Sequence, residues 1–326
     1  MCLLLLTRAF FDSSLQTMNE LACYQELLYG VIFRVSKELP FPESFSCGSL
    51  DTPEISLYAG KPLMDLGLKN KVALVSASSK GLGKAVARSL SREGAKIALC
   101  ARNPGDLDAA AAEIRAETGC EVWAHPADVS VPEEAEAWVR AALEHFGGVH
   151  ILVNNAGGPP PGLFMDFNRE DWEKAFRLNF LSVVSLCKAV LPSMKEQRWG
   201  RIINLTSVAV KQPIDGLILS NAVRTGVIGL AKSLSRELAA HGVSVNNISP
   251  GYTLTDRVKK LARDLAQKEG VEEQEIYRRW ESSIPAGRLG RPEEIGDFVC
   301  FLASERAGYV TGATIQVDGG YVQGTM

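Results

Sequence analysis

One short turn carries residues whose types could hold a phosphate group. Residues 76–83 read SASSKGLG and follow the apolar run VALV, which is typical of a buried strand. Glycines at this place let the backbone approach a pyrophosphate at the start of the next helix. The same composition also occurs where a strand merely packs against a helix, so the turn alone is weak evidence. The cofactor-binding residues expected here are Ser76, Ser78, Lys80, Gly81, Leu82 and Gly83.

Polar and small residues also follow the other predicted strands. They are Asp128 and Val129 after the third strand, Asn155, Ala156 and Gly157 after the fourth, Ser207 at the end of the fifth, and Pro250, Gly251, Tyr252, Thr253 and Thr255 after the sixth. The carboxyl ends of parallel strands meet at one edge of a sheet, and open α/β sheets bind their ligands there. The sequence therefore predicts a dinucleotide site at this edge.

The residues after the second predicted strand bear on the choice of cofactor. NAD binders place an Asp or Glu there to hold the ribose 2′-hydroxyl, whereas a 2′-phosphate requires cations. This chain reads Ala101-Arg102-Asn103, and Lys80 stands in the glycine turn. Two cations without a carboxylate favour NADP(H). The alternative is that both are solvated surface charges.

A regular alternation of strand and helix patterns from Lys71 onward must position these residues. The seven predicted strands are KVALVS, AKIALCA, EVWAH, VHILVN, RIINLTS, VSVNNIS and ATIQV. This order predicts βαβ units, and hence a single doubly wound α/β domain of Rossmann type, with a seven-stranded parallel sheet, over residues 64–326. Ser130 and Glu133 predict a capping box, and Pro292 suits a first helical turn. Residues 255–285 form a long helical excursion that is typical of a lid over a substrate.

The first 63 residues differ from the rest of the chain. They hold four basic and seven acidic residues, and prolines and glycines interrupt their second half. We expect an appendage that is mostly unstructured. A start codon assigned too far upstream would explain this segment as readily as a regulatory arm.

Composition excludes several classes of function. The chain has 326 residues, of which 35 are Lys or Arg and 38 are Asp or Glu, so its net charge of −3 gives no basic patch for nucleic acid. No apolar run reaches about 18 residues, which argues against a membrane span. The seven cysteines show no C-x-x-C pair or zinc spacing, so we expect no metal site and a cytoplasmic protein.

Taken in order, these motifs resemble the short-chain dehydrogenase/reductase family, in particular its 3-oxoacyl-carrier-protein-reductase-like branch. The resemblance runs from about Met64 to Gly320 and includes GRLGRPEEIGDFVCFLAS and VTGATIQVDGG near the end. It implies that Gly81 and Gly83 approach the pyrophosphate, that Asp128 contacts the adenine, and that the NNAG run (154–157) supports sheet and cofactor. It also implies a water-holding kink at Asn179, a substrate contact from Ser207 and a nicotinamide contact from Thr255.

The chain departs from this family pattern where the family handles protons. The family's Tyr-x-x-x-Lys should begin thirteen residues after Ser207, but Ser220 and Arg224 stand there. A serine hydroxyl is a far weaker acid than a tyrosine beside an ammonium, and an arginine does not release its proton. The glycine turn normally begins Thr-Gly, and its replacement by Ser76-Ala77 is tolerable if Ala77 needs no positive φ.

Substitute groups for the missing pair remain hypotheses. Tyr252 could stand near the nicotinamide as a proton donor, although a packing aromatic explains it as well. Lys211 could face the substrate or be an exposed charge. Arg224 could hold the nicotinamide ribose, or bind an anionic substrate together with Lys211.

These observations predict an NADP(H)-dependent oxidoreductase that acts on a small carbonyl or hydroxy compound. Its expected catalytic residues are Asn179, Ser207, Ser220, Arg224 and Tyr252. The alternatives are a dinucleotide-binding sensor or inactive partner subunit, and non-redox chemistry in the same pocket. The resemblance also implies a homotetramer built through helices at 168–196 and 217–241 and the C-terminal strand. The apolar residues Leu178, Leu181, Leu186, Leu230 and Leu234 of these helices could equally be core.

Overall fold

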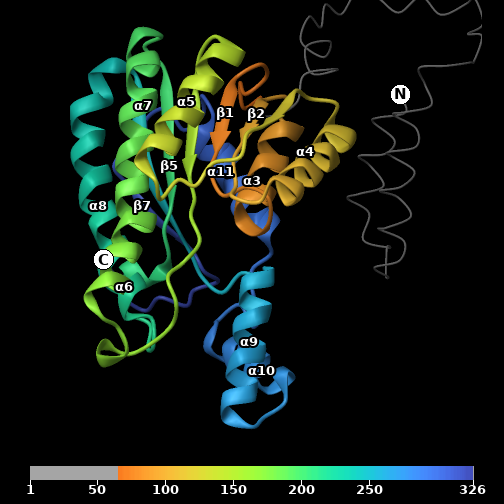
Figure 1. Ribbon diagram of the computed structural model, residues 1–326, viewed down its shortest axis with the longest axis vertical. Helices are drawn as coiled ribbons and strands as arrows, with labels where there is room; N and C mark the ends of the chain where they lie inside the picture. The colour runs from red at the N-terminus through yellow and green to blue at the C-terminus, as the bar shows by residue number, and fades with distance from the viewer. Residues whose placement is uncertain (1–64, 326) are drawn as a thin grey trace, which may run out of the picture. The chain divides into compact units, whose positions relative to one another are not determined.

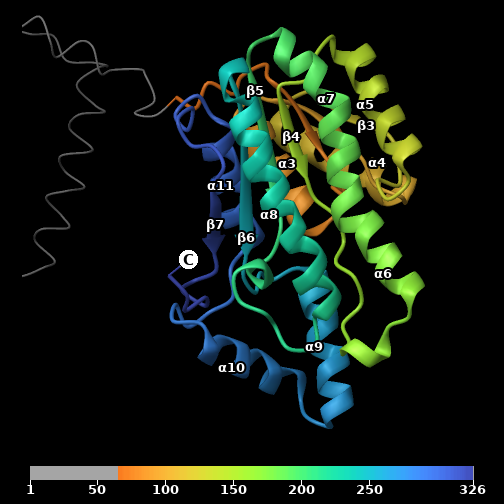
Figure 2. The ribbon, with the colours of Figure 1, turned by 90° about the vertical axis from the view of Figure 1, so that its left-hand side faces the viewer.

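A parallel sheet of seven strands forms the centre of the described chain. The computed structural model describes residues 65–325, so the predicted appendage at 1–63 lies outside the described residues. The strands are β1 (Val72–Val75), β2 (Lys96–Leu99), β3 (Val122–Ala124), β4 (Ile151–Asn154), β5 (Gly200–Leu205), β6 (Val243–Pro250) and β7 (Thr314–Val317). Their order is β3-β2-β1-β4-β5-β6-β7, and all neighbours are parallel (Figures 1 and 2). The predicted doubly wound sheet is confirmed.

Helices cover both faces of this sheet, because its strands are apolar on both sides. Alternate residues of β1 point into separate cores, Ala73 and Val75 into one and Val72 and Leu74 into the other. The first core is closed by α3 (Gly81–Arg92), α4 (Pro104–Thr118) and α11 (Pro292–Ala303). The second is closed by α5 (Pro132–Phe146), α7 (Ser182–Glu196) and α8 (Ile218–Leu238).

The predicted helix starts are right at α11 and wrong at α5. Pro292 is the first residue of α11, and the Glu294 carboxylate accepts a hydrogen bond from Arg291 N at 2.7 Å. The expected capping box of Ser130 does not form, because Val131 is the N-cap of α5. The Ser130 hydroxyl donates to Asp128 Oδ1 at 2.7 Å instead.

The long excursion between β6 and α11 consists of α9 (Asp256–Glu269) and α10 (Glu273–Ser283). Both helices lie beyond the edge at which the strands end (Figures 1 and 2). They share a small apolar cluster of their own around Ala262, Ala266 and Ile276. The excursion therefore stands at the same edge as the predicted site.

One helical run among residues 65–325, Arg169–Glu196, is long and apolar enough to cross a membrane. It contains α6 (Arg169–Phe176), a π-helical turn (Arg177–Leu181) and α7. Val183, Leu186 and Val190 of this run pack in the second core. Buried helices of a doubly wound sheet satisfy the same test of length and composition, so this run is explained by the fold.

The leucines considered for an oligomer interface lie in two environments. Leu186 is only 1% exposed and belongs to the second core. Leu230 and Leu234 are half-buried and pack against that core, while Leu178 and Leu181 are also half-buried. A homotetramer therefore stays a prediction in which Leu186 takes no part.

The turn between β1 and α3 forces an alanine into the left-handed region. Ala77 has a φ of 47°, and only Asn70 and Arg198 share a positive φ among the non-glycine residues of the described chain. The replacement of Thr-Gly by Ser76-Ala77 was expected to be tolerable only if Ala77 needed no positive φ. Ala77 does have a positive φ, so the replacement is strained. An L-residue in this conformation costs about 1–2 kcal/mol because its Cβ crowds the backbone.

We expect Ala77→Gly to raise the free energy of unfolding by about 1 kcal/mol, because glycine adopts this φ without strain. Urea unfolding followed by circular dichroism measures the change. The control is Ala112→Gly at an exposed position inside α4, which should lower the same free energy by about 1 kcal/mol. A loss of stability in Ala77→Gly as large as in the control would show that the turn is not strained.

Candidate functional site

The turn after β1 contains two glycines that another residue could not replace without cost. A Cβ on Gly83 would lie 2.5 Å from the Ala77 carbonyl oxygen and 2.7 Å from Asn155 Nδ2, so only glycine fits at this position. Gly81 has a φ of 59°, which glycine adopts without cost. A Cβ built on Gly81 would lie 3.7 Å from a Thr255 methyl carbon, so the turn faces the start of α9.

Hydrogen bonds between β1 and β4 fix this turn. The Ser76 hydroxyl donates to Asn155 O at 2.7 Å, and Asn155 Nδ2 donates to Ser76 O and Ala77 O at 3.2 and 3.0 Å. The Ser78 hydroxyl donates to Val75 O at 2.8 Å. Ser76 and Ser78 are fully buried, so their hydroxyls shape the turn from behind and do not face the cleft.

The cationic residues near the second strand are free to meet an anion. Lys80 is the N-cap of α3 and Arg102 precedes the N-cap of α4, and both are exposed. Neither forms an ion pair with another part of residues 65–325. Leu82 lies beside them and packs against the first core.

Asp128 and Val129, which follow β3, lie in different environments. One Asp128 carboxylate oxygen accepts hydrogen bonds from Ser130 N and the Ser130 hydroxyl at 2.9 and 2.7 Å. Val129 is 6% exposed and belongs to the second core. Asp128 is half-buried, which leaves part of its carboxylate able to reach a ligand.

The loop after β4 is held by side chains from three distant elements. Four consecutive carbonyls, those of residues 156–159, each accept a side-chain hydrogen bond. The donors are Arg224 of α8 to residue 156, Asn179 of the π-helical turn to residue 157, and Arg257 of α9 to residues 158 and 159. The expected kink at Asn179 is thus a π-helical turn, a feature that is frequent at functional sites.

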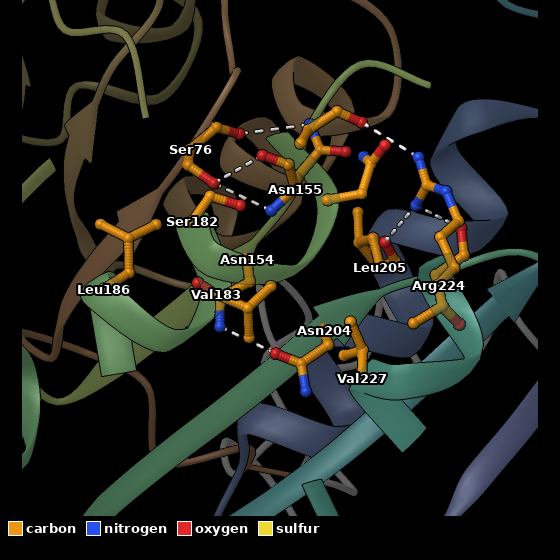
Figure 3. Close-up of a pocket in the computed structure, with 13 residues that line it drawn as sticks. Ser76, Asn154, Asn155, Ser182, Val183, Leu186, Asn204, Leu205, Arg224 and Val227 are labelled. Carbon is orange, nitrogen blue, oxygen red and sulfur yellow. Dashed lines mark hydrogen bonds between the residues drawn. The ribbon is translucent and has the colours of Figure 1, made fainter. Parts of the chain in front are cut away.

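A small cavity lies under this loop (Figure 3). Asn154 donates to Asn204 at 2.8 Å, Asn204 to Asn247 at 2.8 Å, and Asn247 to Thr314 at 3.0 Å, so a row of amides crosses four strands. The Oδ1 atoms of Asn154 and Asn179 have no partner, and both residues line a cavity of about 10 Å³. This volume is near the least that holds one water molecule.

Ser207 follows β5 and begins the short helix Val208–Val210. Its hydroxyl oxygen accepts a hydrogen bond from Ala209 N at 3.2 Å, and the residue is half-buried. A hydroxyl that accepts through its oxygen still has its proton to donate. Ser207 could therefore donate to a substrate oxygen. Lys211 ends the same short helix and is half-buried.

Arg224 is a buried cation whose partners are all neutral. The residue is 8% exposed, and Nη1 donates to Leu205 O and Thr206 O at 3.2 and 3.1 Å (Figure 3). Burial, and then the charge of Arg257, lowers the pKa of Arg224 to about 10. The side chain thus remains charged at neutral pH. Ser220, one turn earlier on α8, is also 8% exposed.

The residues after β6 form the wall opposite the glycine turn. Gly251 is packed so closely that a Cβ there would lie 2.8 Å from Asp318 Cα, and Thr253 is 4% exposed. Pro250 is the last residue of β6 and is buried. The Thr255 hydroxyl oxygen caps α9 by accepting from Val258 N at 3.4 Å.

Tyr252 lies in an aromatic cluster. Its ring stacks on Trp280 of α10 with centroids 4.9 Å apart, and Tyr321 meets it edge-on at 5.5 Å. Burial, and then the neighbouring Tyr321, raises the pKa of Tyr252 to about 12. A raised pKa makes the phenol a weaker acid, which is opposite to what a proton donor requires.

Two features of the site were not found from the sequence. Asn204 and Asn247 were read only as strand residues, although a polar residue in an otherwise apolar strand signals a buried hydrogen-bond network. Arg257 gave no signal at all, because a basic residue near the start of an amphipathic helix is ordinarily exposed.

Comparison with known proteins identifies relatives over most of the described chain. The family described as Enoyl-(Acyl carrier protein) reductase matches residues 76–322. A 3-oxoacyl-[acyl-carrier-protein] reductase of Vibrio cholerae is 40% identical over 255 residues, which cover 78% of this chain and 98% of the relative. Dehydrogenase/reductase SDR family member 4 of Oryctolagus cuniculus is 38% identical over 254 residues, covering 78% of this chain and 94% of the relative.

Solved structures share the fold as well as the sequence. L-Sorbose reductase from Gluconobacter frateurii, complexed with NADPH and L-sorbose, superimposes with a TM-score of 0.77 at 33% identity. The match covers 80% of this chain and 100% of the reductase. The glycine turn at the carboxyl edge of the sheet is consistent with membership of the same family as these relatives. The family match and the sequence identity to these relatives show that the chain belongs to the short-chain dehydrogenase/reductase family.

Proposed function

We propose that the protein is an NADP(H)-dependent oxidoreductase that reduces a carbonyl compound or oxidises the corresponding alcohol, in the manner of 3-oxoacyl-carrier-protein reductases. The observation that carries this proposal is the turn at 76–83, which begins α3 with Gly81 at a positive φ and no room for a side chain on Gly83, because such a glycine turn at a helix N-terminus is suited to binding a pyrophosphate. The Vibrio cholerae relative is named for this reductase activity, and the L-sorbose reductase structure contains NADPH. We keep a homotetramer as a prediction from the same likeness, and a cytoplasmic location as a prediction from the cysteine pattern.

The positive charge of Lys80 and Arg102, where the adenosine part of the nucleotide is expected to bind, supports NADP(H) over NAD(H). Lys80 and Arg102 are exposed and have no acidic partner within residues 65–325, so a 2′-phosphate would meet two available cations. The nicotinamide, when bound, supplies or accepts the hydride. The chain's own residues must bind the nucleotide, orient the carbonyl compound and bring a proton to its oxygen.

We expect the double variant Lys80→Ala/Arg102→Ala to weaken NADPH binding by at least about tenfold and to leave NADH binding within about twofold. The reason is that charge-assisted hydrogen bonds to the 2′-phosphate are lost, and NADH has no such group. Fluorescence titration of the reduced nicotinamide measures both affinities.

The matched control for this experiment is Arg140→Ala on α5, which removes an exposed cation away from the site. It should change neither affinity. Equal weakening of NADPH and NADH in the double variant would contradict recognition of the 2′-phosphate. Failure of the native protein to bind either nucleotide would overturn the proposed function itself.

The catalytic set is non-standard in this proposal. Ser220 and Arg224 occupy the positions of the family's Tyr and Lys. Ser207 donates a hydrogen bond to the substrate oxygen and keeps its own proton, so the proton that this oxygen takes up on reduction comes from water. Arg224 stays protonated and donates to the backbone carbonyls of Ala156, Leu205 and Thr206, so it orients neighbouring groups but relays no proton. Loss of a positioned general acid typically costs about 10²–10⁴ in rate, so we expect slow turnover.

A second candidate function is nucleotide binding without turnover, as in a sensor or an inactive partner subunit. The observation that favours it is the environment of Tyr252, whose burial in an aromatic cluster raises its pKa to about 12, so the phenol predicted as a substitute proton donor is a poor acid. Absorbance of NADPH against a panel of ketones and aldehydes separates the two candidates. Oxidation with any of them supports the reductase, while tight binding without oxidation supports the sensor.

We expect Ser220→Tyr combined with Arg224→Lys to raise the rate of carbonyl reduction by about 10²-fold or more over the native protein, because the pair supplies a phenol acid and an ammonium that lowers its pKa. NADPH oxidation under saturating nucleotide measures the rate. Arg224→Lys alone serves as the control and should not reproduce the gain. An unchanged rate in a double variant that folds and binds NADPH would contradict the assignment of these two positions.

A further inference from the structure

Arg257, the second residue of α9, reaches across the cleft to the loop after β4. Its Nη1 donates to Gly158 O at 2.8 Å and its Nη2 to Pro159 O at 3.1 Å. A Cβ on Gly158 would overlap Arg257 Nη2, so the glycine makes room for the guanidinium. The carbonyl one residue earlier, of Gly157, accepts from Asn179, which puts this cation beside a predicted catalytic residue.

Two positive charges meet at this loop without a negative one. Arg224 donates to the carbonyl of Ala156, and its pKa is lowered by Arg257, so the two guanidinium groups repel one another. Neither guanidinium has a carboxylate within 4.0 Å in the part of the chain that the structure describes. Asp256 precedes Arg257 but is highly exposed, and its carboxylate lies 3.9 Å from Lys259 Nζ.

Neutral carbonyls compensate such charges only in part. Burial lowers the pKa of Arg257, but much of the residue is still exposed to solvent, so a ligand can reach it. A guanidinium gains more from a carboxylate than from two backbone carbonyls, because the bidentate pair forms two parallel hydrogen bonds that are both charge-assisted. The two guanidinium groups at this loop thus leave room for a carboxylate that residues 65–325 do not supply.

We infer that the substrate carries a carboxylate and that Arg257 binds it, exchanging the carbonyls of residues 158 and 159 for the two carboxylate oxygens. This inference rests on the proposed function and names its substrate class as an oxo acid. Arg224 supplies a second, fixed positive charge at the same loop. The sequence hypothesis paired Arg224 with Lys211, whereas the contacts make Arg257 its cationic neighbour.

The location of Arg257 explains how it could select one substrate over another. Arg257 belongs to the α9–α10 excursion, whereas the carbonyls that it holds belong to the loop after β4. A carboxylate held by Arg257 at this loop would lie close to the carbonyl that Asn179 holds. A neutral ester of the same size would leave the guanidinium on its two carbonyls and gain no ion pair.

The test compares 4-oxopentanoate with its methyl ester. NADPH oxidation gives the ratio of kcat/KM for acid over ester, and calorimetric titration of the NADP⁺-saturated protein gives the affinity for each without requiring turnover. We expect Arg257→Met to lower both acid-to-ester ratios by about tenfold or more, mainly through KM and Kd. Arg257→Lys should retain part of the preference, because it keeps the charge but loses the bidentate geometry.

Arg263→Met is the matched control, since it removes an exposed cation from the same helix, and it should leave both ratios unchanged. Equal affinity of the native protein for acid and ester, or ratios unchanged by Arg257→Met, would overturn the inference. If NADP⁺ does not bind, the proposed function fails separately, and titration of the free protein with the two compounds still decides whether Arg257 recognises the carboxylate.

Discussion

The hydrogen bonds of Asn155 are the interaction on which the rest of the site depends. The strand order reverses between β1 and β4, and ligands of open α/β sheets bind at this switch point. Asn155 spans the gap by donating to the carbonyls of Ser76 and Ala77, while its own backbone carbonyl accepts from the Ser76 hydroxyl. Gly83 must then be bare, because any side chain would strike this amide and the Ala77 carbonyl. One amide thus fixes both the glycine turn and the start of the loop at 156–159.

The fold was predictable because its signals are local. Each strand is a short apolar run after a helix pattern, and burial on both faces leaves little ambiguity in a run such as VALV. Helix ends were less secure: Ser130 has a capping side chain, yet its hydroxyl is taken by Asp128 two residues earlier. The strain at Ala77 was also hidden, because the sign of φ depends on how the turn packs against Asn155 and not on residue type alone.

The site was predictable only as a set of positions. The sequence indicated which residues gather at the carboxyl edge, since strand ends meet there. It could not say which way each side chain points: the hydroxyls of Ser76 and Ser78 turn inward, and Tyr252 stacks within an aromatic cluster. The role of Arg257 depends on a contact between residues almost one hundred positions apart, for which the sequence carries no pattern. Whether Arg257 has a carboxylate partner can be seen only once its neighbours in the folded chain are known.

The central claim is that the carboxyl edge binds NADP(H) with the reactive ring beside Ser207. A crystal structure of the protein grown with NADPH tests this most directly. We expect the pyrophosphate over Gly81 and Gly83, the 2′-phosphate between Lys80 and Arg102, and the nicotinamide within reach of the Ser207 hydroxyl. A nucleotide bound with its ring away from Ser207, or a cleft that remains closed at saturating NADPH, would contradict it.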